Sequence, residues 1–513
     1  MKRIETWTPE DEGFWAREGR RIADRNLWIA VPALLLAFAV WLYWSIIIVQ
    51  MQNLGFPFTT EQLYMLPAVA GLSGATLRIP NSFLIAMSGG RNVIFLTTTL
   101  LLLPAALTGF ALQDMQTPYI YFVVAAALSG LGGGNFASSM SNISFFFPKR
   151  RQGLALGVNA GLGNLGVSVM QVLLPAIMGV ALLGAFSGEG IPLPPAAEES
   201  AGTPVYVQNS GFVWIPALLL LSALTFFGMN NLPMHFRGSA LVGMAKALWL
   251  LLLGLTAAGA GLALLLWLEW NMWIVLPLTV LLTLLLMRTF TPATVRASLA
   301  TQYAIFRRKH TWVMTWLYVM TFGSFIGYSA AFPKLIQDVF GSLADGTTNA
   351  AAPDPLAYAW LGPLVGSLAR PFGGWLSDKW GGARVTHWDT VVMIAAAVAV
   401  AVTVQLAREA ATPEAYFPPF LAAFLVLFIA TGVGNGSTFR MVPIIFEPAQ
   451  AGPVLGWTSA VAAYGAFIIP KIFGAQIQSG HAEYALYGFA AYYVSCLVVN
   501  WWYYARKNAE ISC

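Results

Sequence analysis

Residues 75–91, ATLRIPNSFLIAMSGGR, decide the fold of this 513-residue chain together with residues 366–384, GSLARPFGGWLSDKWGGAR. Both stretches place an arginine close before a proline inside an apolar run, Arg78 in the first and Arg370 in the second. Both then end with a glycine pair and a further arginine. Two such similar stretches, far apart in one chain, indicate an internal repeat.

A second pair of similar stretches extends this repeat. GLGGGNFASSMSNISFFFP at 130–148 and GVGNGSTFRMVPIIFEP at 432–448 each open with glycines and an asparagine and close with apolar residues and a proline. They follow the first pair in the same order, and two more apolar runs follow each of them. The pattern predicts two parallel repeats of six helices, with a site near the middle of a membrane where the repeats meet.

The composition sets the class of protein. Hydrophobic residues make up 58% of the chain and charged residues 10%, against roughly 25% charged residues in soluble proteins. The mean hydropathy is +0.68. These values exclude a water-soluble globular enzyme, and no nucleophile–base pair stands out. The cysteines, Cys496 and Cys513, and the four histidines are too scattered for a disulfide framework or a metal cluster, so we expect no metal and no cofactor.

Apolar runs long enough for a transmembrane helix, about 20 residues, occur fourteen times. They lie at 27–50, 63–88, 93–113, 118–146, 153–184, 210–229, 246–267, 271–289, 312–338, 357–376, 388–407, 417–446, 453–475 and 483–504. We therefore predict an all-α polytopic membrane protein of 14 transmembrane helices. Its expected parts are a cytoplasmic segment 1–26, a six-helix bundle 27–229, a linker 230–310 with two extra helices (246–267 and 271–289), a second six-helix bundle 311–504 and a cytoplasmic tail 505–513.

The lysines and arginines predict the orientation of these helices. With the N-terminus in the cytoplasm, Arg408 is the one basic residue in the outer loops, and the other loop cations fall on the inner side. We therefore expect both termini in the cytoplasm. The longest outer loop, 185–209, holds three glutamates and no basic residue, and it is expected to be a connector. The net charge of +5 is then a signal of topology, and nucleic-acid binding is not expected.

Arg78 and Arg370 lie inside their predicted spans. A cation in the middle of a spanning helix costs about 2.5–3.5 kcal/mol, so such residues are usually functional. The alternatives are that each arginine reaches the membrane surface or pairs with an acid, but no acidic residue is expected near the middle of a span. Two guanidinium groups facing one cavity would form an anion site, and the planar fork of arginine matches a planar oxyanion.

Other cations and acids lie nearer to the predicted helix ends. Lys334 and Lys471 are expected to reach the outer membrane surface, and Arg440 is expected to pair with Glu447 at the inner end. Every acid and every histidine is placed in a loop or at a helix end, so a dedicated proton relay within the membrane is not expected.

Glycine-rich stretches are the next signal. GVNAGLGNLG at 157–166 contains Gly161, Gly163 and Gly166, and GVGNG at 432–436 contains Gly434 and Gly436. Small residues let helices approach closely, and plain packing accounts for most of them. Their density also fits helix surfaces that slide or bend as a cavity opens to alternate sides. Asn164, inside such a run, is a candidate ligand for an anion.

GGWLSDKWGGAR at 373–384 is similar to the short loop of the major facilitator superfamily, G-x-x-x-D-[RK]-x-G followed by a basic residue. The similarity implies that Asp378 and Arg384 lock one conformational state through contact with a neighbouring helix end.

A set of longer stretches carries a more specific resemblance. LRIPNSF, GLGGGNFASSMSNISFFFPKR, NAGLGNLGVSVMQ, TFGSFIGYSAAF, GNGSTFRMVP and GWTSAVAAYGAFIIPK together resemble the nitrate/nitrite porter family (NarK-type) of the major facilitator superfamily. The likeness covers residues 27–229 and 311–504. The extra helix pair departs from the usual twelve helices, with Glu269 in its outer turn, and is expected to pack at the periphery of the bundle.

The resemblance implies roles for individual residues. The central arginines, here Arg78 and Arg370, would bind the anion, with Asn164 and Tyr318 as hydrogen-bonding partners. The remaining implied residues are Phe136 and Phe322, which would sandwich the planar ion, and the glycine signatures at 157–168 and 456–466, the latter with Tyr464 and Gly465. From the residues alone, Phe136, Tyr318 and Phe322 could equally be packing residues.

We therefore expect a monomeric alternating-access carrier in the inner membrane that exchanges nitrate for nitrite. Two guanidinium groups occluded without an anion would repel each other in a medium of low dielectric constant, and a bound anion offsets much of that cost, which favours exchange. Nitrate–proton symport, an anion channel and a nitrate sensor are the alternatives.

Overall fold

The computed structural model describes residues 4–182, 184, 188–194, 202–233, 238–293, 296–297, 300, 303–343 and 346–513. The helices up to the linker are α1 (Glu12–Phe14), η1 (Trp15–Gly19), α2 (Arg20–Leu42), α3 (Trp44–Asn53), α4 (Thr60–Ser88), α5 (Gly90–Leu100), α6 (Leu102–Ala111), α7 (Tyr119–Phe146), α8 (Lys149–Met178), α9 (Asn209–Phe212) and α10 (Trp214–Gly228). The predicted outer loop between α8 and α9 contains a short antiparallel pair, β1 (Ile191–Pro192) and β2 (Pro204–Val205). Glu198 and Glu199 of that loop lie outside the described residues, as does Arg237 of the linker.

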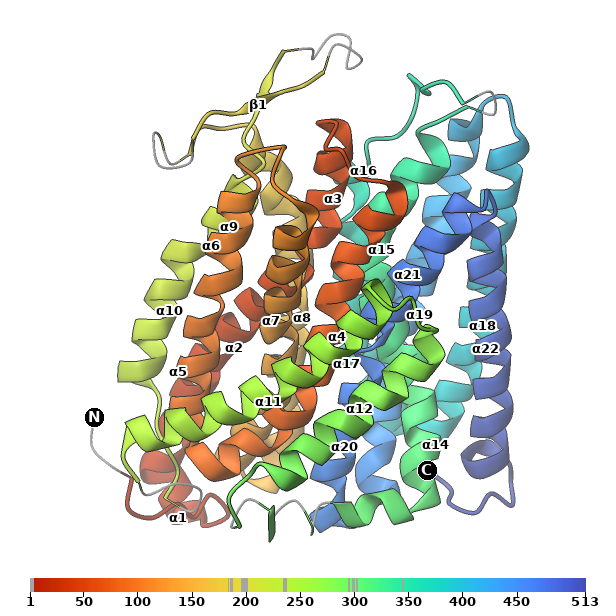
Figure 1. Cartoon of the computed structure of the whole chain (residues 1–513). Helices are drawn as coiled ribbons and strands as arrows, with labels where there is room; N and C mark the ends of the chain where they lie inside the picture. The colour runs from red at the N-terminus through yellow and green to blue at the C-terminus, as the bar shows by residue number, and fades with distance from the viewer. Residues whose placement is uncertain are drawn as a thin grey trace.

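The second part of the chain is also helical. Its elements are α11 (Ala240–Leu266), α12 (Met272–Thr289), η4 (Tyr303–Arg307), α14 (Lys309–Tyr318), η5 (Val319–Gly323), α15 (Ser324–Phe340), α16 (Pro355–Tyr358), α17 (Leu361–Trp380), α18 (Gly382–Glu409), η6 (Pro413–Tyr416), α19 (Phe417–Ile445), α20 (Pro448–Ala462), α21 (Gly465–Gln478), α22 (Ala482–Asn500) and η7 (Trp501–Ala505). Most of these helices run along one direction, and the two chain ends lie at the same end of the molecule (Figure 1).

The expected fourteen helical spans are present. In the part of the chain that the structure describes, 11 helices are long and apolar enough to cross a membrane. The three other predicted spans are helical as well: α4, the run α14–η5–α15, and α17. These three contain the charged side chains of Arg78, Lys334 and Arg370, respectively. Helix is the expected state because lipid offers no partner for backbone N–H and C=O groups.

The internal repeat is visible in how the two arginine helices end. α4 stops at Gly89 with a φ of 80°, and α17 stops at Gly381 with a φ of 87°. Glycine adopts this left-handed conformation without the steric cost that a Cβ imposes. Each of these two glycines belongs to a pair and a new helix begins at the next residue, so the glycine pairs in the sequence mark equivalent turns in the two repeats.

Glycines also form the close helix pairs of each half. α4 packs against α7, where a Cβ on Gly130 would collide with Ser73, and a Cβ on Gly133 would lie 2.8 Å from the Cα of Gly74. α17 packs against α19, where a Cβ on Gly436 would collide with the backbone carbonyl of Arg370. In both halves the arginine helix is therefore held against a glycine-rich neighbour.

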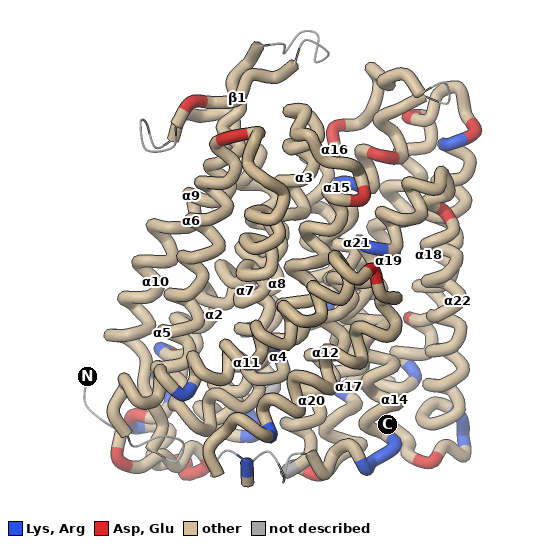
Figure 2. Tube along the Cα trace, in the orientation of Figure 1, with Lys and Arg blue, Asp and Glu red and all other residues tan. Residues whose placement is uncertain are grey.

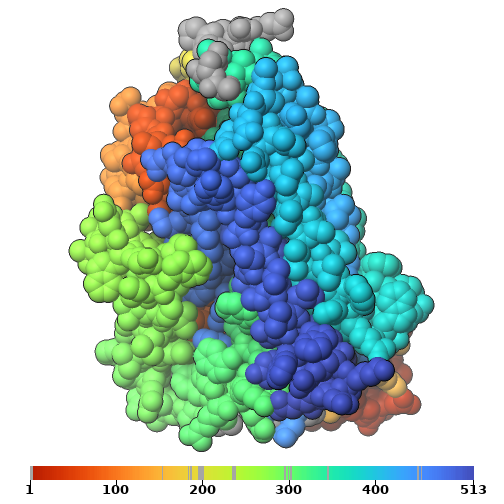
Figure 3. Space-filling model, turned by 90° about the vertical axis from the view of Figure 1, so that its right-hand side faces the viewer, coloured from red at the N-terminus to blue at the C-terminus, as the bar shows by residue number. Residues whose placement is uncertain are grey.

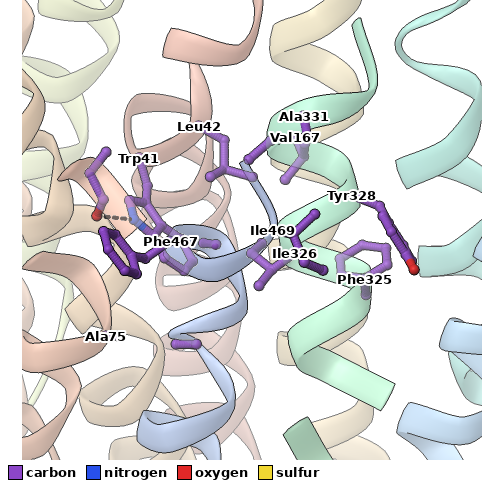
Figure 4. Packing of buried hydrophobic residues seen from close by; sticks show 14 of the residues in the cluster. Trp41, Leu42, Ala75, Val167, Phe325, Ile326, Tyr328, Ala331, Phe467 and Ile469 are labelled. Atoms are coloured by element: carbon purple, nitrogen blue, oxygen red, sulfur yellow. Dashed lines mark hydrogen bonds between the residues drawn. The ribbon is translucent and has the colours of Figure 1, made fainter. Parts of the chain in front are cut away.

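The two halves meet along one continuous hydrophobic cluster. Figure 4 shows Trp41, Leu42 and Ala75 of the first half near Phe467, and Val167 near Ala331. The indole N–H of Trp41 donates to the carbonyl of Ala70 at 2.8 Å. Lysines and arginines gather at the end of the molecule that holds both termini, which we call the basic end (Figure 2).

The extra helix pair, α11 and α12, runs obliquely across the bundle in the view of Figure 1 and stands on its outside in Figure 3. α11 packs against α4, because a Cβ on Gly254 would lie 3.0 Å from Leu77 and Pro80 of that helix. Glu269 lies in the turn between the two helices, with a φ of 51°. The pair therefore contacts the helix that carries Arg78.

Candidate substrate-binding site

Arg78 is fully buried on α4, with no exposed surface. Its Nε donates to the carbonyl of Gly133 at 2.9 Å, and one terminal nitrogen donates to the carbonyl of Ser459 at 3.1 Å. The second terminal nitrogen has no hydrogen-bond partner. Gly133 belongs to the first half of the chain and Ser459 to the second, so the guanidinium group bridges the two halves and keeps one donor available.

Arg370 lies on α17 in the second half and is 7% exposed. One terminal nitrogen contacts the hydroxyl oxygen of Tyr318 at 3.4 Å, and the other has no partner. The guanidinium carbon lies 6.0 Å from the ring centroid of Phe136, and that of Arg78 lies 4.7 Å from the same ring. The two arginines therefore approach one another around a single phenylalanine.

Aromatic rings lie beside the two arginines. Phe136 and Phe322 stack with their centroids 6.0 Å apart and an interplanar angle of 25°. Tyr318 stacks on Phe322 at 5.7 Å and 10°. The guanidinium carbon of Arg78 lies 4.8 Å from the Phe322 centroid. We call this group of five residues, Arg78, Arg370, Tyr318, Phe136 and Phe322, the arginine site.

The charge of the arginine site is not balanced by protein acids. Among the residues that the structure describes, no carboxylate forms an ion pair with Arg78 or Arg370. Each of these two buried cations has a terminal nitrogen without a partner, so an anion that accepts hydrogen bonds from both is a suitable ligand.

Asn164 stands apart from this group. It lies on α8 and is 1% exposed, and its amide oxygen has no partner. It makes no hydrogen bond to any residue of the arginine site. The structure thus places it in the interior without joining it to the arginines.

The other predicted residues of the glycine signatures lie at helix contacts. A Cβ on Gly166 would collide with the backbone of Leu35, and a Cβ on Gly465 would collide with the backbone of Gly323. A Cβ on Gly163 would lie 2.7 Å from the Leu34 side chain. Gly161 differs, because nothing lies within 4 Å of the position of its Cβ.

Tyr464 contributes a polar contact between the halves. Its hydroxyl group hydrogen-bonds the Thr76 hydroxyl at 2.8 Å, and it lies at the break between α20 and α21. The predicted span at 453–475 is present as Pro453–Gln478, and it is interrupted at Ala463 and Tyr464 between α20 and α21.

In the loop motif, Asp378 contacts a neighbouring helix near its end, as expected, but its partner is Arg440, which the sequence predicts to pair with Glu447. Asp378 accepts a hydrogen bond from Arg440 Nε at 2.6 Å, and both side chains are about half exposed. The expected partner of Arg440, Glu447, is exposed instead. Arg384 is also exposed and has no ion pair among the described residues. The pair joins α17 to α19 within one half, because the last turn of α17 lies beside the basic end of α19.

Lys334 does not reach the membrane surface as expected. It is fully buried on α15 and forms an ion pair with Asp338, one turn further along the same helix. Its ammonium group also lies 5.3 Å from the ring centroid of Tyr64, which belongs to α4 of the other half. The spacing of Lys334 and Asp338, four residues apart, is a signal of such a pair that the sequence offers.

Asp389, which the sequence places at the end of a span, lies further inside its helix. This residue is 8% exposed and its Oδ2 has no hydrogen-bond partner. The predicted span began at 388, whereas α18 begins at Gly382, so the carboxyl group lies two turns inside the helix. No motif marks it, and its burial depends on helices distant in the sequence.

Comparison with known proteins gives relatives that match nearly the whole chain, although no family model matches it. The chain is 38% identical to a "Probable nitrate/nitrite antiporter NarK2" of Thermus thermophilus, over 99% of this chain and 98% of that protein. It is 34% identical to "Nitrate/nitrite transporter NarU" of Escherichia coli (strain K12), over 98% of this chain and 96% of that protein.

Solved structures share the fold. The xylose transporter XylE from E. coli, in a partially occluded inward-open conformation, superposes with a TM-score of 0.58 at 10% identity and covers 94% of this chain and 99% of its own. A bacterial homologue of the human lysosomal transporter Spinster superposes with a TM-score of 0.53 at 15% identity, over 93% of this chain and 96% of its own.

Proposed function

This chain belongs to the nitrate/nitrite transporter family of the major facilitator superfamily, and we propose that it exchanges nitrate for nitrite across the inner membrane by alternating access. Its relatives are transporters and not enzymes. The small inorganic anions are therefore the proposed cargo, and no cofactor takes part in the proposed cycle.

One observation carries the proposal. Two buried guanidinium groups, one from each half, lie around Phe136, each with a donor that has no partner. Nitrate and nitrite are planar, carry one negative charge and accept hydrogen bonds in their own plane. Such an ion beside the stacked rings of Phe136 and Phe322 would receive hydrogen bonds from both arginines and, if α8 approaches, from Asn164.

The same charges support exchange. A closed site without an anion would hold two cations together in a medium of low dielectric constant, which is costly. A bound anion offsets much of this cost, so the change between the two open states proceeds most readily when the site is loaded. Return of the carrier then requires an anion from the other side.

Orientation and helix contacts complete the proposal. The basic end faces the cytoplasm, with both termini there, and the protein works as a monomer. The glycine contacts at Gly163, Gly166, Gly434, Gly436 and Gly465 let the helices within each half slide or bend, and Tyr464 contacts Thr76 of the other half. Asp378 locks one state through its pair with Arg440, and exposed Arg384 is available to the other half in that state.

Counterflow in proteoliposomes tests the exchange. Vesicles that contain unlabelled nitrite or nitrate should take up labelled nitrate quickly, whereas empty vesicles should take up little. Sustained uptake into empty vesicles at equal pH on both sides would indicate a channel and would contradict the proposal.

Nitrate–proton symport is the second candidate, and buried Asp389 favours it because a membrane carboxyl group can carry a proton. Net uptake into empty vesicles, driven by an inward proton gradient, would establish symport in place of exchange.

A further inference from the structure

Asp389 is an acid that the exchange cycle described above does not use. It lies on α18 with 8% of its surface exposed, its buried Oδ2 has no hydrogen-bond partner, and it takes part in none of the ion pairs of the described residues. A buried carboxylate without a donor or a cation is costly, whereas the protonated acid carries no charge to solvate. This position is therefore suited to gain and lose a proton.

The carboxyl group lies where three helical segments meet. A Cβ on Gly434 of α19 would collide with Oδ2 of Asp389, and it would lie 2.7 Å from the methyl carbon of Thr321. Thr321 belongs to η5. Glycine at 434 thus makes room for the carboxyl group against the back of η5.

The segment η5 holds two residues of the arginine site. Tyr318 caps its start and Phe322 lies within it. Thr321 contacts the backbone carbonyl of Tyr318 at 3.4 Å and the hydroxyl of Thr438 at 3.2 Å. π-helical turns are rare and occur frequently at functional sites. Oδ2 of Asp389 and the methyl group of Thr321 both lie beside Gly434, and Tyr318, at the start of η5, contacts Arg370 at 3.4 Å.

The titratable side chains on the helices around Asp389 contact other residues or form no ion pair with Asp389. Arg440 of α19 pairs with Asp378, Tyr493 of α22 hydrogen-bonds Ser324 and Tyr328, and Arg370 of α17 faces Tyr318. The remaining ones are His387 and Arg384 on α18 itself and Cys496 on α22, whose thiol contacts the carbonyl of Trp316. None of these described groups forms an ion pair with Asp389.

We propose that Asp389 is a proton-binding site linked to anion binding, so that its carboxyl group takes up one proton from water when nitrate or nitrite binds at the arginine site. The ionised form places a negative charge near η5. This charge repels an entering nitrate or nitrite and itself partly offsets the positive charge of the two arginines. The neutral form removes this opposition. Linkage is reciprocal, so the anion also favours the proton.

This inference rests on the proposed function but adds a second ligand to it. In exchange, both nitrate and nitrite travel with the proton on Asp389, and no net proton flux results. The anion affinity nevertheless falls as pH rises through the titration of Asp389, by about tenfold per pH unit where one proton is fully linked.

Calorimetry on the purified full-length protein tests the linkage. Nitrate is titrated at several pH values in buffers of different ionisation enthalpy, which reports the protons taken up on binding. We expect wild type to take up close to one proton above the titration of Asp389. Asp389→Asn, which keeps the shape of the side chain, should take up none and should lose the pH dependence. His387→Gln, which removes the neighbouring titratable ring, should behave as wild type.

The proposal is overturned if Asp389→Asn retains the proton uptake, or if wild type shows none at any pH. Infrared difference spectra of wild type need no variant: addition of nitrate should increase the band of a protonated carboxyl group, and a loss or absence of that band contradicts the inference. Counterflow of Asp389→Asn separates the two proposals. If Asp389→Asn still exchanges anions with an unchanged pH profile, only the proposed role of Asp389 is contradicted. If wild type shows no exchange, the proposed function is contradicted.

Discussion

At the scale of single residues, the ability of the arginine site to bind an anion depends on the guanidinium nitrogens that have no partner within the protein. Arg78 donates to backbone carbonyls from Nε and one terminal nitrogen, and Arg370 contacts Tyr318 with one terminal nitrogen; in both, the other terminal nitrogen has no partner. A lysine has a single charged group and cannot do both tasks, because its donors all radiate from one nitrogen atom. The fork of arginine is therefore required both for position and for the anion.

Arg78→Lys and Arg370→Lys should each weaken nitrate binding. The loss of a hydrogen bond from a charged donor costs about 1.5–3 kcal/mol, which corresponds to roughly tenfold to a hundredfold in affinity. Calorimetric titration with nitrate measures it. Arg17→Lys, an exposed arginine at the basic end, is the matched control and should bind as wild type. Unchanged affinity in both site variants would contradict the assignment of the anion site.

The pair Lys334–Asp338 gives a second prediction at this scale. Both side chains are buried, with 0% and 7% exposed, so removal of one leaves an unpaired charge. Lys334→Met should destabilise the protein by about 3–5 kcal/mol, because a buried charge without its partner is costly.

The double variant Lys334→Met with Asp338→Leu should recover much of this loss, since it buries no charge. Thermal unfolding in detergent measures both. A double variant that is less stable than the single one would show that the ion pair itself is strongly stabilising.

At the scale of elements, small residues decide which helices can touch. The arginine helix of each half, α4 or α17, packs against a glycine-rich partner, and its final turn ends at a glycine of positive φ. The extra helix α11 uses the same principle through Gly254, which brings it against α4.

Gly254→Leu should therefore disturb α4, whereas Gly259→Leu on the same helix should not. A Cβ at 254 would already lie 3.0 Å from Leu77 and Pro80, while nothing lies within 4 Å of the corresponding position at 259. Overpacking of this kind costs about 1–3 kcal/mol. We expect Gly254→Leu to lower the unfolding temperature and the counterflow rate. Equal behaviour of the two variants would indicate that α11 does not depend on this contact.

At the scale of the whole molecule, the distribution of charge bears on the orientation in the membrane, and contacts between the halves hold the state observed. Lysines and arginines gather at the basic end (Figure 2). The buried pair of Lys334 and Asp338 beside Tyr64, and the hydrogen bond from Gln337 to Asn53 at 2.6 Å, join α15 to α4 and to the end of α3. These contacts connect the halves away from the basic end.

The orientation is tested with single cysteines. In a background in which Cys513 and Cys496 are replaced by serine, Glu12→Cys at the basic end should react with a membrane-impermeant maleimide only after cells are opened. Glu61→Cys, exposed at the start of α4, should react in intact cells. The reverse pattern would contradict a cytoplasmic basic end. Cells that produce either variant should grow on neutral medium and should show unaltered transport, which excludes misfolding of the variants.

Much of this protein follows from its sequence, because lipid is a demanding solvent. A bilayer requires closed backbone hydrogen bonds and about 20 apolar residues per span, so composition and run length alone predict the fourteen helices. An arginine within such a run stands out for the same reason, and its repetition predicts two equivalent helices. The resemblance of longer stretches then points to the family.

Tertiary structure decided the pairing of the remaining charges. Whether Asp389 meets a donor, whether Arg440 contacts Asp378 or Glu447, and whether Lys334 reaches the surface all depend on the rotation of each helix and on neighbours distant in the chain. Helix ends matter too, since six residues at the start of α18 move Asp389 from a predicted terminus to the interior. Burial of a charge is a property of the assembled helices, because only their packing determines which side chains water can reach.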